Sequence, residues 1–354
     1  MAPVVGRSEG SSVPRSADVA RLAGVSRKTV SRVLNNEPYV SEEARTKVLA
    51  AAESLGYRLN QAARTLASGR TGSIGVVALG TAGYGTASLL VHIERAVRDA
   101  GYALRVVNTP DGDPTSIAGA VEALLEQGVD GVVVSEPIVE GDVGVRIDVP
   151  VLFLGAPPSF TASRTVTMGV GAHALARAAT EHLLDLGHAT VHHLAGPRRW
   201  YATKDRIEGW RAALAARGVR EPPLLNGDWS AASGHAVGRS LASDRSVTAL
   251  FAAGDEMAIG FIHALREAGR RVPEDMSVVG FDGNPVFAYV SPPLTTVRQP
   301  FEAAAREGIR LLVHAIGQPD TDLPRASDPP VELVLRGSTA PPPSRPDTAG
   351  RHTT

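Results

Sequence analysis

Short aliphatic runs alternate with amphipathic stretches from residue 73 to residue 282, and this alternation limits the possible folds more than any other feature. Continuous runs of Val, Ile and Leu are typical of parallel strands that are buried on both faces. The runs are SIGVVAL, YALRVVN, GVDGVVVS, VPVLFLG, TVHHLAG, VTALFAAG and MSVVGFD. The stretches between them predict helices near residues 88–100, 115–127, 170–186, 203–217, 230–243 and 256–269. The alternation therefore predicts an α/β fold of doubly wound parallel sheets, long enough for two lobes.

The composition narrows the class of protein further. The chain has 354 residues, which is enough for two or three domains. It has no cysteine, and this excludes disulfides, iron–sulfur clusters and thiol catalysis. No apolar run approaches the roughly 18 residues that span a bilayer, and the first residues lack the apolar core of a signal peptide. We therefore expect a cytoplasmic protein with no membrane partner.

The formal net charge of −1 conceals an uneven distribution along the chain. Residues 15–70 carry a net charge of +5, whereas residues 71–354 carry −6. A small basic head on a larger acidic body indicates a polyanionic partner for the head alone. Chance clustering of charged residues is the alternative.

Three short helical patterns occupy the basic head, residues 15–59. Ser16 can cap the first helix and Gly24 can end it. Ser26 can cap the second helix and Ser41 the third. Apolar residues recur at helical spacing in all three patterns: Val19, Ala20, Ala23, Val30, Val33, Leu34, Val48, Ala51, Ala52 and Leu55.

The second predicted helix of the head carries basic residues at its start. Arg27 and Lys28 take its first positions, and Arg32 lies about one turn beyond Lys28 on the same face. Two helices joined by a tight turn that contains glycine describe a helix-turn-helix, whose second helix enters the major groove. Arginine can hold a guanine edge with two hydrogen bonds. The head is therefore predicted to bind double-stranded DNA.

The stretch DVARLAGVSRKTVSRVLNNEPYVSEEARTKVLAAAESLGYRLN resembles the DNA-binding head of the lac-repressor/gal-repressor (LacI/GalR) family of bacterial transcriptional regulators. The resemblance is dense over the head and continues more loosely to about residue 338. It implies DNA contacts from the second helix and its surroundings: Ser16, Ser26, Arg27, Lys28, Thr29, Ser31, Arg32, Asn35 and Tyr39.

The next segment, residues 60–71, matches the hinge helix and linker of that family. The resemblance implies that this segment folds on operator DNA and enters the minor groove, with contacts from Asn60, Ala63 and Leu66. Leu66 matches the leucine that wedges into the central base step. Such a wedge unstacks two bases, and the bent duplex that results makes better contact with the protein. From the residues alone, Ala62, Ala63 and Leu66 would equally suit the core of an ordinary helix.

The resemblance also implies a body like that of a periplasmic sugar-binding protein, with two lobes and three chain crossings between them. The body is expected at residues 72–338. The expected lobes are residues 72–164 with 299–325, and residues 165–298 with 326–338. The two ends of the chain are expected to be disordered from their composition, at residues 1–14 and 339–354.

Polar and aromatic residues that follow predicted strands are candidates for a ligand site, because ligands of such sheets bind beyond the carboxyl ends of the strands. Asp255 follows TALFAAG, Asp282 follows SVVGF, and Arg206 and Trp229 lie in other such segments. Charged planar groups can bridge neighbouring sugar hydroxyls, and an aromatic ring can cover the apolar face of the sugar. The set therefore favours a small-molecule effector, with a sugar or sugar derivative as the expected class.

The resemblance assigns roles to these positions. Arg206 matches the arginine that clamps the effector, and Asp282 matches the aspartate of the family's G-[FY]-D motif. Trp229 matches the aromatic residue of sugar-responsive members. Further pocket residues are Tyr84, in the loop after the first strand, and two residues at the back of the pocket, Gln299 and Phe301.

Two of the candidates have a plainer interpretation. Asp282 could form a turn at the end of its strand through its own side chain, with no ligand involved. Asp255 stands at the start of a predicted helix and could serve only as its cap.

The chain departs from the family pattern at several positions. Gly254 stands where the family has asparagine, Met168 where aspartate is common, and Gly283 where a second acid follows Asp282. In the head, Leu59 replaces a common proline and Arg15 a common threonine. The identity of the effector therefore does not follow from the resemblance.

Other motifs that could carry chemistry are incomplete. Adjacent strand residues point to opposite faces, so His192 and His193 cannot both face one metal ion beside His188. The glycine-rich stretch GTAGYG fits neither the dinucleotide-binding pattern nor the P-loop pattern. No serine lies in a G-x-S-x-G nucleophile elbow. We therefore expect no enzyme activity, no metal and no cofactor.

Together these features predict a nucleoid-associated regulator, and specifically a repressor. It would bind a near-palindromic operator as a homodimer and respond to an effector in the cleft between the lobes. A cytoplasmic sugar-binding or sugar-converting protein with an incidental helical head is the alternative. The residues do not decide between inducer and corepressor or between dimer and tetramer, and they do not identify the operator.

Overall fold

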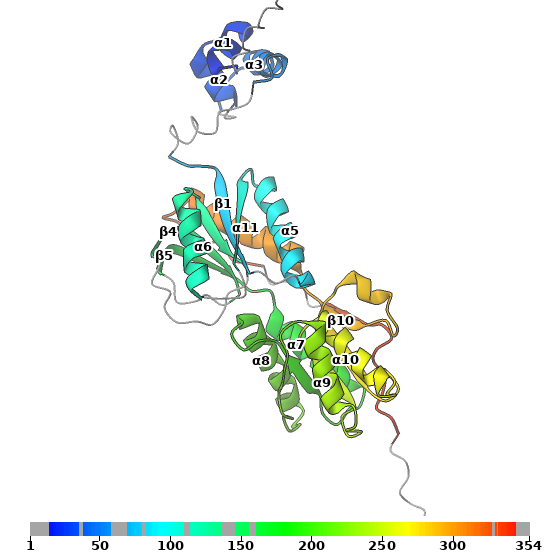
Figure 1. Cartoon of the computed structure of the whole chain (residues 1–354). Coiled ribbons are helices and arrows are strands. Elements are labelled where there is room, and N and C mark those ends of the chain that lie inside the picture. Colours follow the sequence, from blue (N-terminus) through cyan, green and yellow to red (C-terminus); the bar gives the residue numbers. More distant parts are fainter. Residues whose placement is uncertain are drawn as a thin grey trace, which may run out of the picture. The chain divides into compact units, whose positions relative to one another are not determined.

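The structure is a computed structural model that describes residues 14–34, 38–57, 69–79, 83–109, 114–135, 146–155, 161–327, 330 and 332–344. The chain divides between residues 71 and 72 into two compact units, which we call the head and the body (Figure 1). No helix among the described residues is both long enough and apolar enough to cross a lipid bilayer.

The head is a bundle of three helices, α1 (Ser16–Ala23), α2 (Arg27–Leu34) and α3 (Glu42–Ser54). Gly24 ends α1 in the left-handed conformation, with φ of 66°. One apolar cluster joins the three helices: Val19, Ala20, Ala23, Val30, Val33, Val48, Ala51 and Ala52. Because these residues form the inner stripes of all three helices, the polar faces of the helices remain available to solvent.

The start of α1 differs from the prediction. Ser16 is the first helical residue, and Arg15 takes the N-cap position that was expected for Ser16. The backbone N–H of Arg15 donates to the Asp18 carboxylate at 2.9 Å, because an acid three residues after the cap can satisfy the exposed N–H there. Ser26 and Ser41 do accept hydrogen bonds from the first turns of α2 and α3, as predicted.

The first lobe of the body is built on a parallel sheet with strand order β2-β1-β3-β4-β5. Its strands are β1 (Ser73–Leu79), β2 (Ala103–Thr109), β3 (Gly131–Val134), β4 (Arg146–Leu154) and β5 (Thr161–Met168). Helices α5 (Tyr84–Asp99) and α11 (Phe301–Gly317) bury one face of this sheet, and α6 (Pro114–Glu126) buries the other.

The second lobe has the strand order β11-β10-β9-β8-β6-β7, in which only β11 is antiparallel to its neighbour among the described strands. The strands are β6 (His192–Ala195), β7 (Leu225–Asn226), β8 (Ala249–Ala252), β9 (Ser277–Asp282), β10 (Thr295–Arg298) and β11 (Glu332–Val334). One face packs on α7 (Ala172–Asp185) and α8 (Tyr201–Ala216), and the other on α9 (Ala231–Leu241) and α10 (Asp255–Glu267). A short 3₁₀ helix, η1 (Pro285–Ala288), follows β9.

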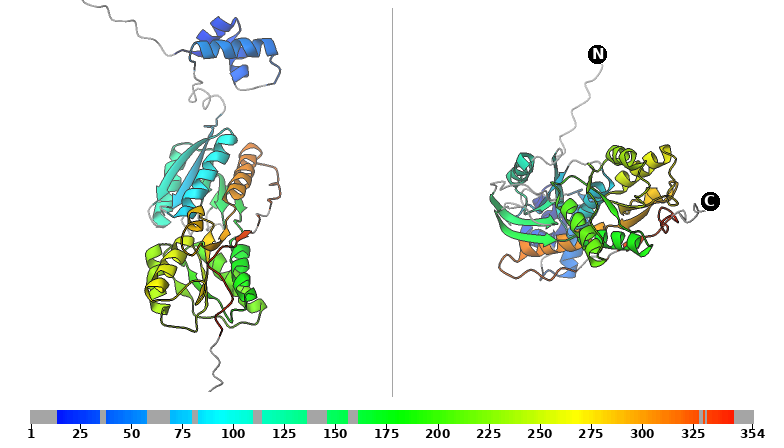
Figure 2. Two further views of the ribbon diagram at one scale, coloured as in Figure 1. Left: turned by 90° about the vertical axis from the view of Figure 1, so that its right-hand side faces the viewer. Right: turned by 90° about the horizontal axis from the view of Figure 1, so that it is seen from below.

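The chain crosses between the lobes three times: from β5 to α7, from β10 to α11, and from α11 to β11 (Figure 2). The first crossing comes after Met168, later than the predicted change of lobe at residues 164/165. The reason is that β5 pairs with β4 up to the Leu154–Met168 register position, so the whole strand belongs to the first sheet.

The expected disorder from residue 339 onward is wrong for the start of that segment. The Ser277 hydroxyl in β9 donates to the carbonyl of Ala340 at 2.8 Å and accepts from the N–H of Ala340 at 2.9 Å. Ser338 donates to the carbonyl of Val278 and accepts from the N–H of Thr295. Composition marked this segment as flexible, but β9 and β10 supply partners for its polar groups.

Candidate functional site

The outward face of α2 holds the side chains that were predicted to contact DNA. Arg27 and Lys28 are exposed, and no hydrogen bond or ion pair to another described residue engages their side chains. Ser26 and Thr29 enclose them in the first turn of α2, where the Ser26 hydroxyl accepts from the N–H of Thr29 at 3.0 Å. Ser31 and Arg32 are exposed on the same helix, and Ser16 is half-buried at the start of α1.

Tyr39 comes after α2 in the chain and is 97% exposed. Its backbone has φ of 68°, a region that bulky residues rarely occupy. An exposed ring held on a strained backbone is a frequent feature of binding surfaces.

Four of the predicted DNA contacts lie outside the described residues: Asn35, Asn60, Ala63 and Leu66. The hinge interpretation of residues 60–71 therefore remains a prediction from the sequence, because the structure describes only residues 69–71 of this segment. The same is true of the disorder that was expected at residues 1–13.

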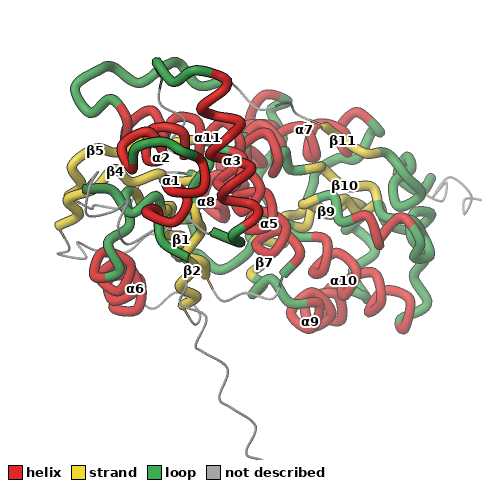
Figure 3. The backbone as a smooth tube through the Cα atoms, turned by 90° about the horizontal axis from the view of Figure 1, so that it is seen from above, coloured by secondary structure: helices red, strands yellow, loops and turns green. Residues whose placement is uncertain are grey.

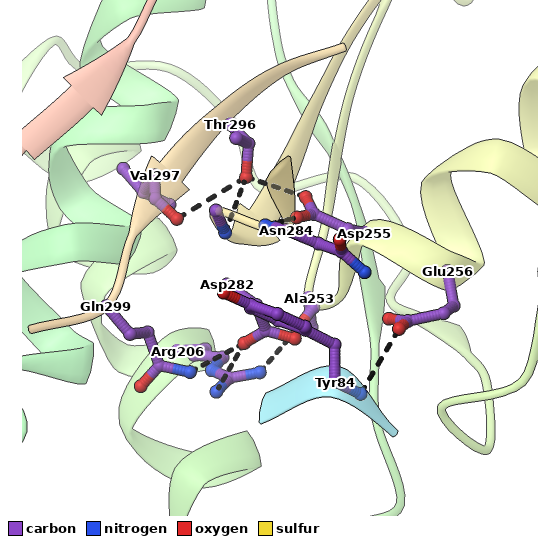
Figure 4. A network of polar contacts seen from close by, with 11 residues as sticks. Tyr84, Arg206, Ala253, Asp255, Glu256, Asp282, Asn284, Thr296, Val297 and Gln299 are labelled. Carbon is purple, nitrogen blue, oxygen red and sulfur yellow. Dashed lines mark hydrogen bonds and ion pairs between the residues drawn. The ribbon is translucent and has the colours of Figure 1, made fainter. Parts of the chain in front are cut away.

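In the body, the end of β9 brings three of the predicted effector residues together (Figure 4). The carboxylate of Asp282 accepts a 2.6 Å hydrogen bond from the side-chain amide of Gln299. The guanidinium of Arg206, on α8, lies 3.8 Å from the same carboxylate oxygen. The side chains of Arg206 and Asp282 are only 7% and 12% exposed, so the pair is largely shielded from water.

Arg206 is held in place by more than this charge pair. Its guanidinium donates to the carbonyl of Ala253, at the end of β8. The guanidinium carbon lies 3.9 Å from the ring centre of Phe281 and 5.2 Å from that of Trp229. Contacts of the cation with both ring faces stabilise the charge and orient it toward Asp282.

Trp229 and Trp200 form an aromatic corner beside this pair. Their ring centres are 5.9 Å apart at an interplanar angle of 78°. A Cβ atom at Gly196 would lie 2.2 Å from the Trp229 ring, so the indole position depends on that glycine. The indole Nε1 of Trp229 is buried, and no described residue accepts a hydrogen bond from it. A ligand oxygen would be a suitable partner for this N–H.

Unusual backbone conformations coincide with the predicted sites. Among the described residues, the non-glycine positions with positive φ are Tyr39, Trp229 and Asp282, at 68°, 75° and 115°. All three were singled out from the sequence as binding residues. Strained backbone of this kind persists only where surrounding contacts impose it, and it is concentrated at functional positions.

Burial changes the proton affinity of the acids in this network. Burial raises the pKa of Asp282 to about 6, although the nearby Arg206 charge and the Gln299 hydrogen bond act in the opposite direction. Burial and the charge of Asp282 also raise the pKa of Asp255. Both carboxyl groups are therefore poised to take up a proton more readily than an exposed aspartate.

Asp255 has a different position from the one expected from the sequence. Gly254 takes the N-cap of α10, and Asp255 is the first helical residue, with no exposed surface. Its carboxylate accepts from the Thr296 hydroxyl at 2.6 Å and from the N–H of Asn284 at 2.8 Å. Asp255 therefore holds the loop after β9 through buried hydrogen bonds, it does not cap α10, and it is not among the residues that line the inner or the outer cavity described below.

Two cavities meet at Asp282 and Gln299. The inner cavity is small, about 50 Å³, and lies between the lobes. Its lining includes Arg206, Trp229, Trp200 and Glu256, together with Gly83, Gly85 and Thr86 at the start of α5. The outer cavity is larger, about 610 Å³, and is lined by Tyr84, Phe301 and Arg298 among others.

The predicted pocket residues thus divide between the two cavities. Arg206 and Trp229 line the inner one, and Tyr84 and Phe301 line the outer one. The sequence interpretation missed Trp200 and Glu256, which complete the inner lining. The loops that follow β1, β2, β3 and β4 in the first lobe lie outside the described residues.

A hydrogen bond between the lobes passes beside the inner cavity. The backbone N–H of Tyr84, the first residue of α5, donates to the Glu256 carboxylate of α10 at 3.3 Å. Tyr84 was expected in a loop, but α5 begins at this residue, earlier than the predicted start near residue 88. The Tyr84 ring also packs edge-on to Phe301, with ring centres 6.4 Å apart.

The positions that depart from the family pattern differ in how far the structure explains them. At Gly254 a Cβ atom would make ordinary contact with the Trp229 ring at 3.7 Å, so the backbone and the Trp229 ring do not require glycine there. Met168 is buried in the apolar cluster of the first lobe. Gly283 has φ of 77°, and a Cβ atom would lie 2.9 Å from Arg298, so an acid at this position would be strained.

Two stretches of the chain match known protein families. Residues 17–60 match the family described as bacterial regulatory proteins, lacI family. Residues 180–339 match the periplasmic binding protein-like domain. The chain is also 35% identical over 329 residues to the HTH-type transcriptional regulator CelR of Thermobifida fusca, with 90% of this chain and 94% of that protein covered.

Solved structures extend the similarity over nearly the whole chain. The lac repressor dimer bound to operator and the anti-inducer ONPF has a TM-score of 0.75 and 30% identity, covering 93% of this chain and 100% of that one. A complex of the transcriptional regulator CelR with cellobiose has a TM-score of 0.65 and 31% identity, covering 92% and 99%. The predicted fold class, a helix-turn-helix head with a two-lobed α/β body, is confirmed.

Proposed function

Because the chain belongs to the lacI family of bacterial regulatory proteins, we propose that it is a repressor whose operator binding is controlled by a small carbohydrate. Like its relatives, it is a DNA-binding transcriptional regulator and not an enzyme. The carbohydrate would occupy the cleft between the lobes. The observation that carries this proposal is the buried Arg206–Asp282 pair beside Trp229 at the inner cavity.

For DNA binding, the proposal places the exposed start of α2 in the major groove, where Arg27 and Lys28 reach base edges. A dimer presents two heads, and twofold protein symmetry requires a near-palindromic operator. The lac repressor, which the chain resembles over most of its length, is a dimer on its operator in the solved complex. Leu66 would wedge into the minor groove between the half-sites.

For the effector, the proposal assigns complementary contacts to each side chain. Asp282 accepts hydrogen bonds from sugar hydroxyls, Arg206 donates to sugar oxygens, and the Trp229 ring covers an apolar face. The CelR relative is solved with cellobiose, which supports a carbohydrate as the class. The inner cavity, about 50 Å³, is smaller than a sugar ring, so a sugar would also occupy the adjoining outer cavity of about 610 Å³.

The switch in this proposal operates through the contact between the lobes. A ligand on Asp282 and Arg206 also touches the start of α5, where Tyr84 already binds Glu256 across the cleft. Ligand binding would therefore change how the lobes pack and, through them, how closely the two hinge segments can approach. A differential affinity of about 1–3 kcal/mol between the two states is enough for a useful switch.

The test combines a ligand screen with operator binding. We expect cellobiose or another small sugar to raise the melting temperature, alter Trp229 fluorescence, and change affinity for labelled DNA from upstream of the protein's own gene. Asp282→Asn and Arg206→Ala should abolish the response while operator binding without ligand persists. Trp229→Phe is the control for the signal, because Trp200 and Trp210 contribute background fluorescence.

Two results would contradict the proposal. If Asp282→Asn lowers stability but keeps the ligand response, Asp282 only organises the turn after β9. If the protein binds sugar but shows no preference for any upstream DNA, the assignment of the regulatory target is wrong.

A further inference from the structure

The second lobe carries a group of metal-ligating side chains on the α9–α10 pair, away from the effector cavities. His235 lies on α9, and His263 and Glu267 lie four residues apart on α10. Residues four apart share one face of a helix, so His263 and Glu267 both face α9 at this point. Figures 1 and 3 show α9 and α10 lying side by side.

Glycines bring the backbones of the two helices into direct contact. A Cβ atom at Gly234 would lie 2.0 Å from the carbonyl oxygen of Met257. A Cβ atom at Gly260 would lie 1.8 Å from the carbonyl oxygen of Ala231. Gly234 directly precedes His235 and Gly260 lies three residues before His263, so the spacing between the side chains is set by rigid helices and not by loops.

The donor atoms of the three side chains converge on one point. His235 Nε2 lies 2.7 Å from one Glu267 oxygen, and His263 Nε2 lies 3.4 Å from the other. All three ligand atoms lie within 4.8 Å of one another. In a tetrahedral zinc site with bonds of about 2.0–2.1 Å, ligand atoms are about 3.3 Å apart, so small side-chain rotations are sufficient.

We propose that His235, His263 and Glu267 bind one divalent transition-metal ion of the zinc class. Two imidazole nitrogens and one carboxylate form a donor set that suits zinc, whereas magnesium and calcium prefer oxygen ligands alone. The side chains are 31%, 63% and 52% exposed, so an ion can enter from solvent and keep water in the fourth position.

The surroundings set limits on the affinity. The hydrogen bond from His235 lowers the pKa of Glu267, and the charge of Arg239 acts in the same direction. Glu267 is therefore an anion at neutral pH, but a cationic side chain near it also disfavours a second cation. We expect binding weaker than that of buried structural zinc sites, whose binding free energies are about 10–16 kcal/mol.

The consequence of binding is a cross-link between two helices that both begin beside the inner cavity. Trp229 comes just before the N-cap of α9, and Glu256 lies in the first turn of α10. An ion bound farther along the pair would stabilise the second lobe without occupying the effector cleft.

The test uses the full, untagged chain freed of metal and titrated calorimetrically with zinc chloride. We expect one ion per chain, no saturable binding of magnesium, and a rise in melting temperature of about 5 °C at a hundredfold excess of free zinc over Kd. His235→Ala, His263→Ala and Glu267→Gln should each weaken binding at least tenfold. The matched control is His173→Ala, since His173 is an exposed histidine on α7.

Cobalt substitution provides a second measurement that does not depend on any variant. A visible absorption band of tetrahedral cobalt would support the site, and loss of that band in His263→Ala would assign it. The proposal is overturned if zinc binding is absent or non-stoichiometric, or if the three site variants bind zinc as the wild type and His173→Ala do. In that case His235 and Glu267 form an ordinary surface ion pair.

Discussion

In the proposed function, the head and the cleft of the body each use an arginine to contact a partner, but the structure holds the two arginines in opposite ways. Arg27 in the head is exposed, and its side chain has no bond to another described residue. Arg206 in the cleft is 7% exposed and engages Asp282, the carbonyl of Ala253 and two aromatic rings. The head's fold therefore depends on the apolar stripes of its helices, whereas the cleft's binding residues are part of the fold.

This difference determines whether a mutation can change binding without changing stability. In the head, the residues proposed to contact DNA differ from those that form the apolar core, so DNA binding and stability can each be changed alone. In the cleft, the same side chains contribute to both, and a change in ligand response has to be measured beside a change in stability.

The largest contrast is expected for arginine removal in the two regions. Arg206→Ala leaves Asp282 buried without its cation, so it should lower the free energy of unfolding of the body by about 4 kcal/mol. Arg27→Ala should change stability by less than about 0.5 kcal/mol, because it is an exposed side chain. Urea unfolding followed by tryptophan fluorescence reports on the body, which contains Trp200, Trp210 and Trp229. Circular dichroism reports on the head as well. If the two substitutions lower the free energy of unfolding by the same amount, Arg27 and Arg206 do not differ in their contribution to stability.

The pH dependence of stability should also differ between the regions. The folded body keeps the proton on Asp282, whose pKa is about 6, over a range in which the unfolded carboxyl has lost it. This contribution is therefore present below about pH 4 and is lost as the pH rises through 6. Relative to Asp282→Asn, the wild type should lose up to about 3 kcal/mol of stability between pH 4 and pH 7.

The head should show the opposite trend. A hydrogen bond from Lys47 lowers the pKa of Glu43, so its contribution is lost as the pH falls. Unfolding curves of wild type and Asp282→Asn at several pH values check the trend in the body, and the same curves for Glu43→Gln check the trend in the head. A difference between the two proteins that does not vary with pH would show that Asp282 is not buried as a carboxylic acid.

Substitutions on the recognition helix should reduce operator affinity and leave the ligand response intact. Arg27→Ala or Lys28→Ala should weaken binding to the cognate operator by about 2 kcal/mol and relax sequence preference. Fluorescence anisotropy with operator and random DNA provides the measurement. If affinity for random DNA falls by the same factor, these residues contact phosphates and do not read bases.

The smallest expected effects test whether the two units unfold independently. Ser41 caps α3 in the head, accepting from the N–H of Ala44 at 3.3 Å, and Ser230 caps α9 in the body, accepting from the N–H of Ser233 at 3.1 Å. Replacing either serine by alanine should cost about 1 kcal/mol. We expect calorimetry to show each loss in one unit only. A shift of both transitions by either variant would show that the units are coupled in solution.

The head could be predicted almost completely from the sequence, because its signals are local. Caps and apolar stripes lie within a few residues of one another, and Gly24 ends α1 where it was expected. The wrong prediction that Ser16 caps α1 also has a local cause. The Asp18 carboxylate accepts from the N–H of Arg15, which moves the N-cap to Arg15.

The buried strands of the body could be predicted, but contacts between residues far apart in the sequence could not. The strand β5, TASRTVTM, alternates polar and apolar residues at a sheet edge and was missed, since the prediction relied on continuous aliphatic runs. The roles of Asp255 and Glu256 depend on Thr296 and Tyr84, which no local pattern connects to them. Trp200 carried one usable signal, as an aromatic residue just after the strand HHLA.

The path of the chain has a consequence for synthesis on the ribosome. The core of the first lobe includes Ile309, Leu312 and Ile316 of α11, which are made long after the strands that they cover. The second lobe needs Ser338 and Ala340, made later still, to satisfy β9. Neither lobe can therefore reach its final packing until these late segments have been made, whereas the three helices of the head are complete once residue 54 has emerged. A nascent chain would display its DNA-reading surface well before it had a completed cleft with which to regulate it.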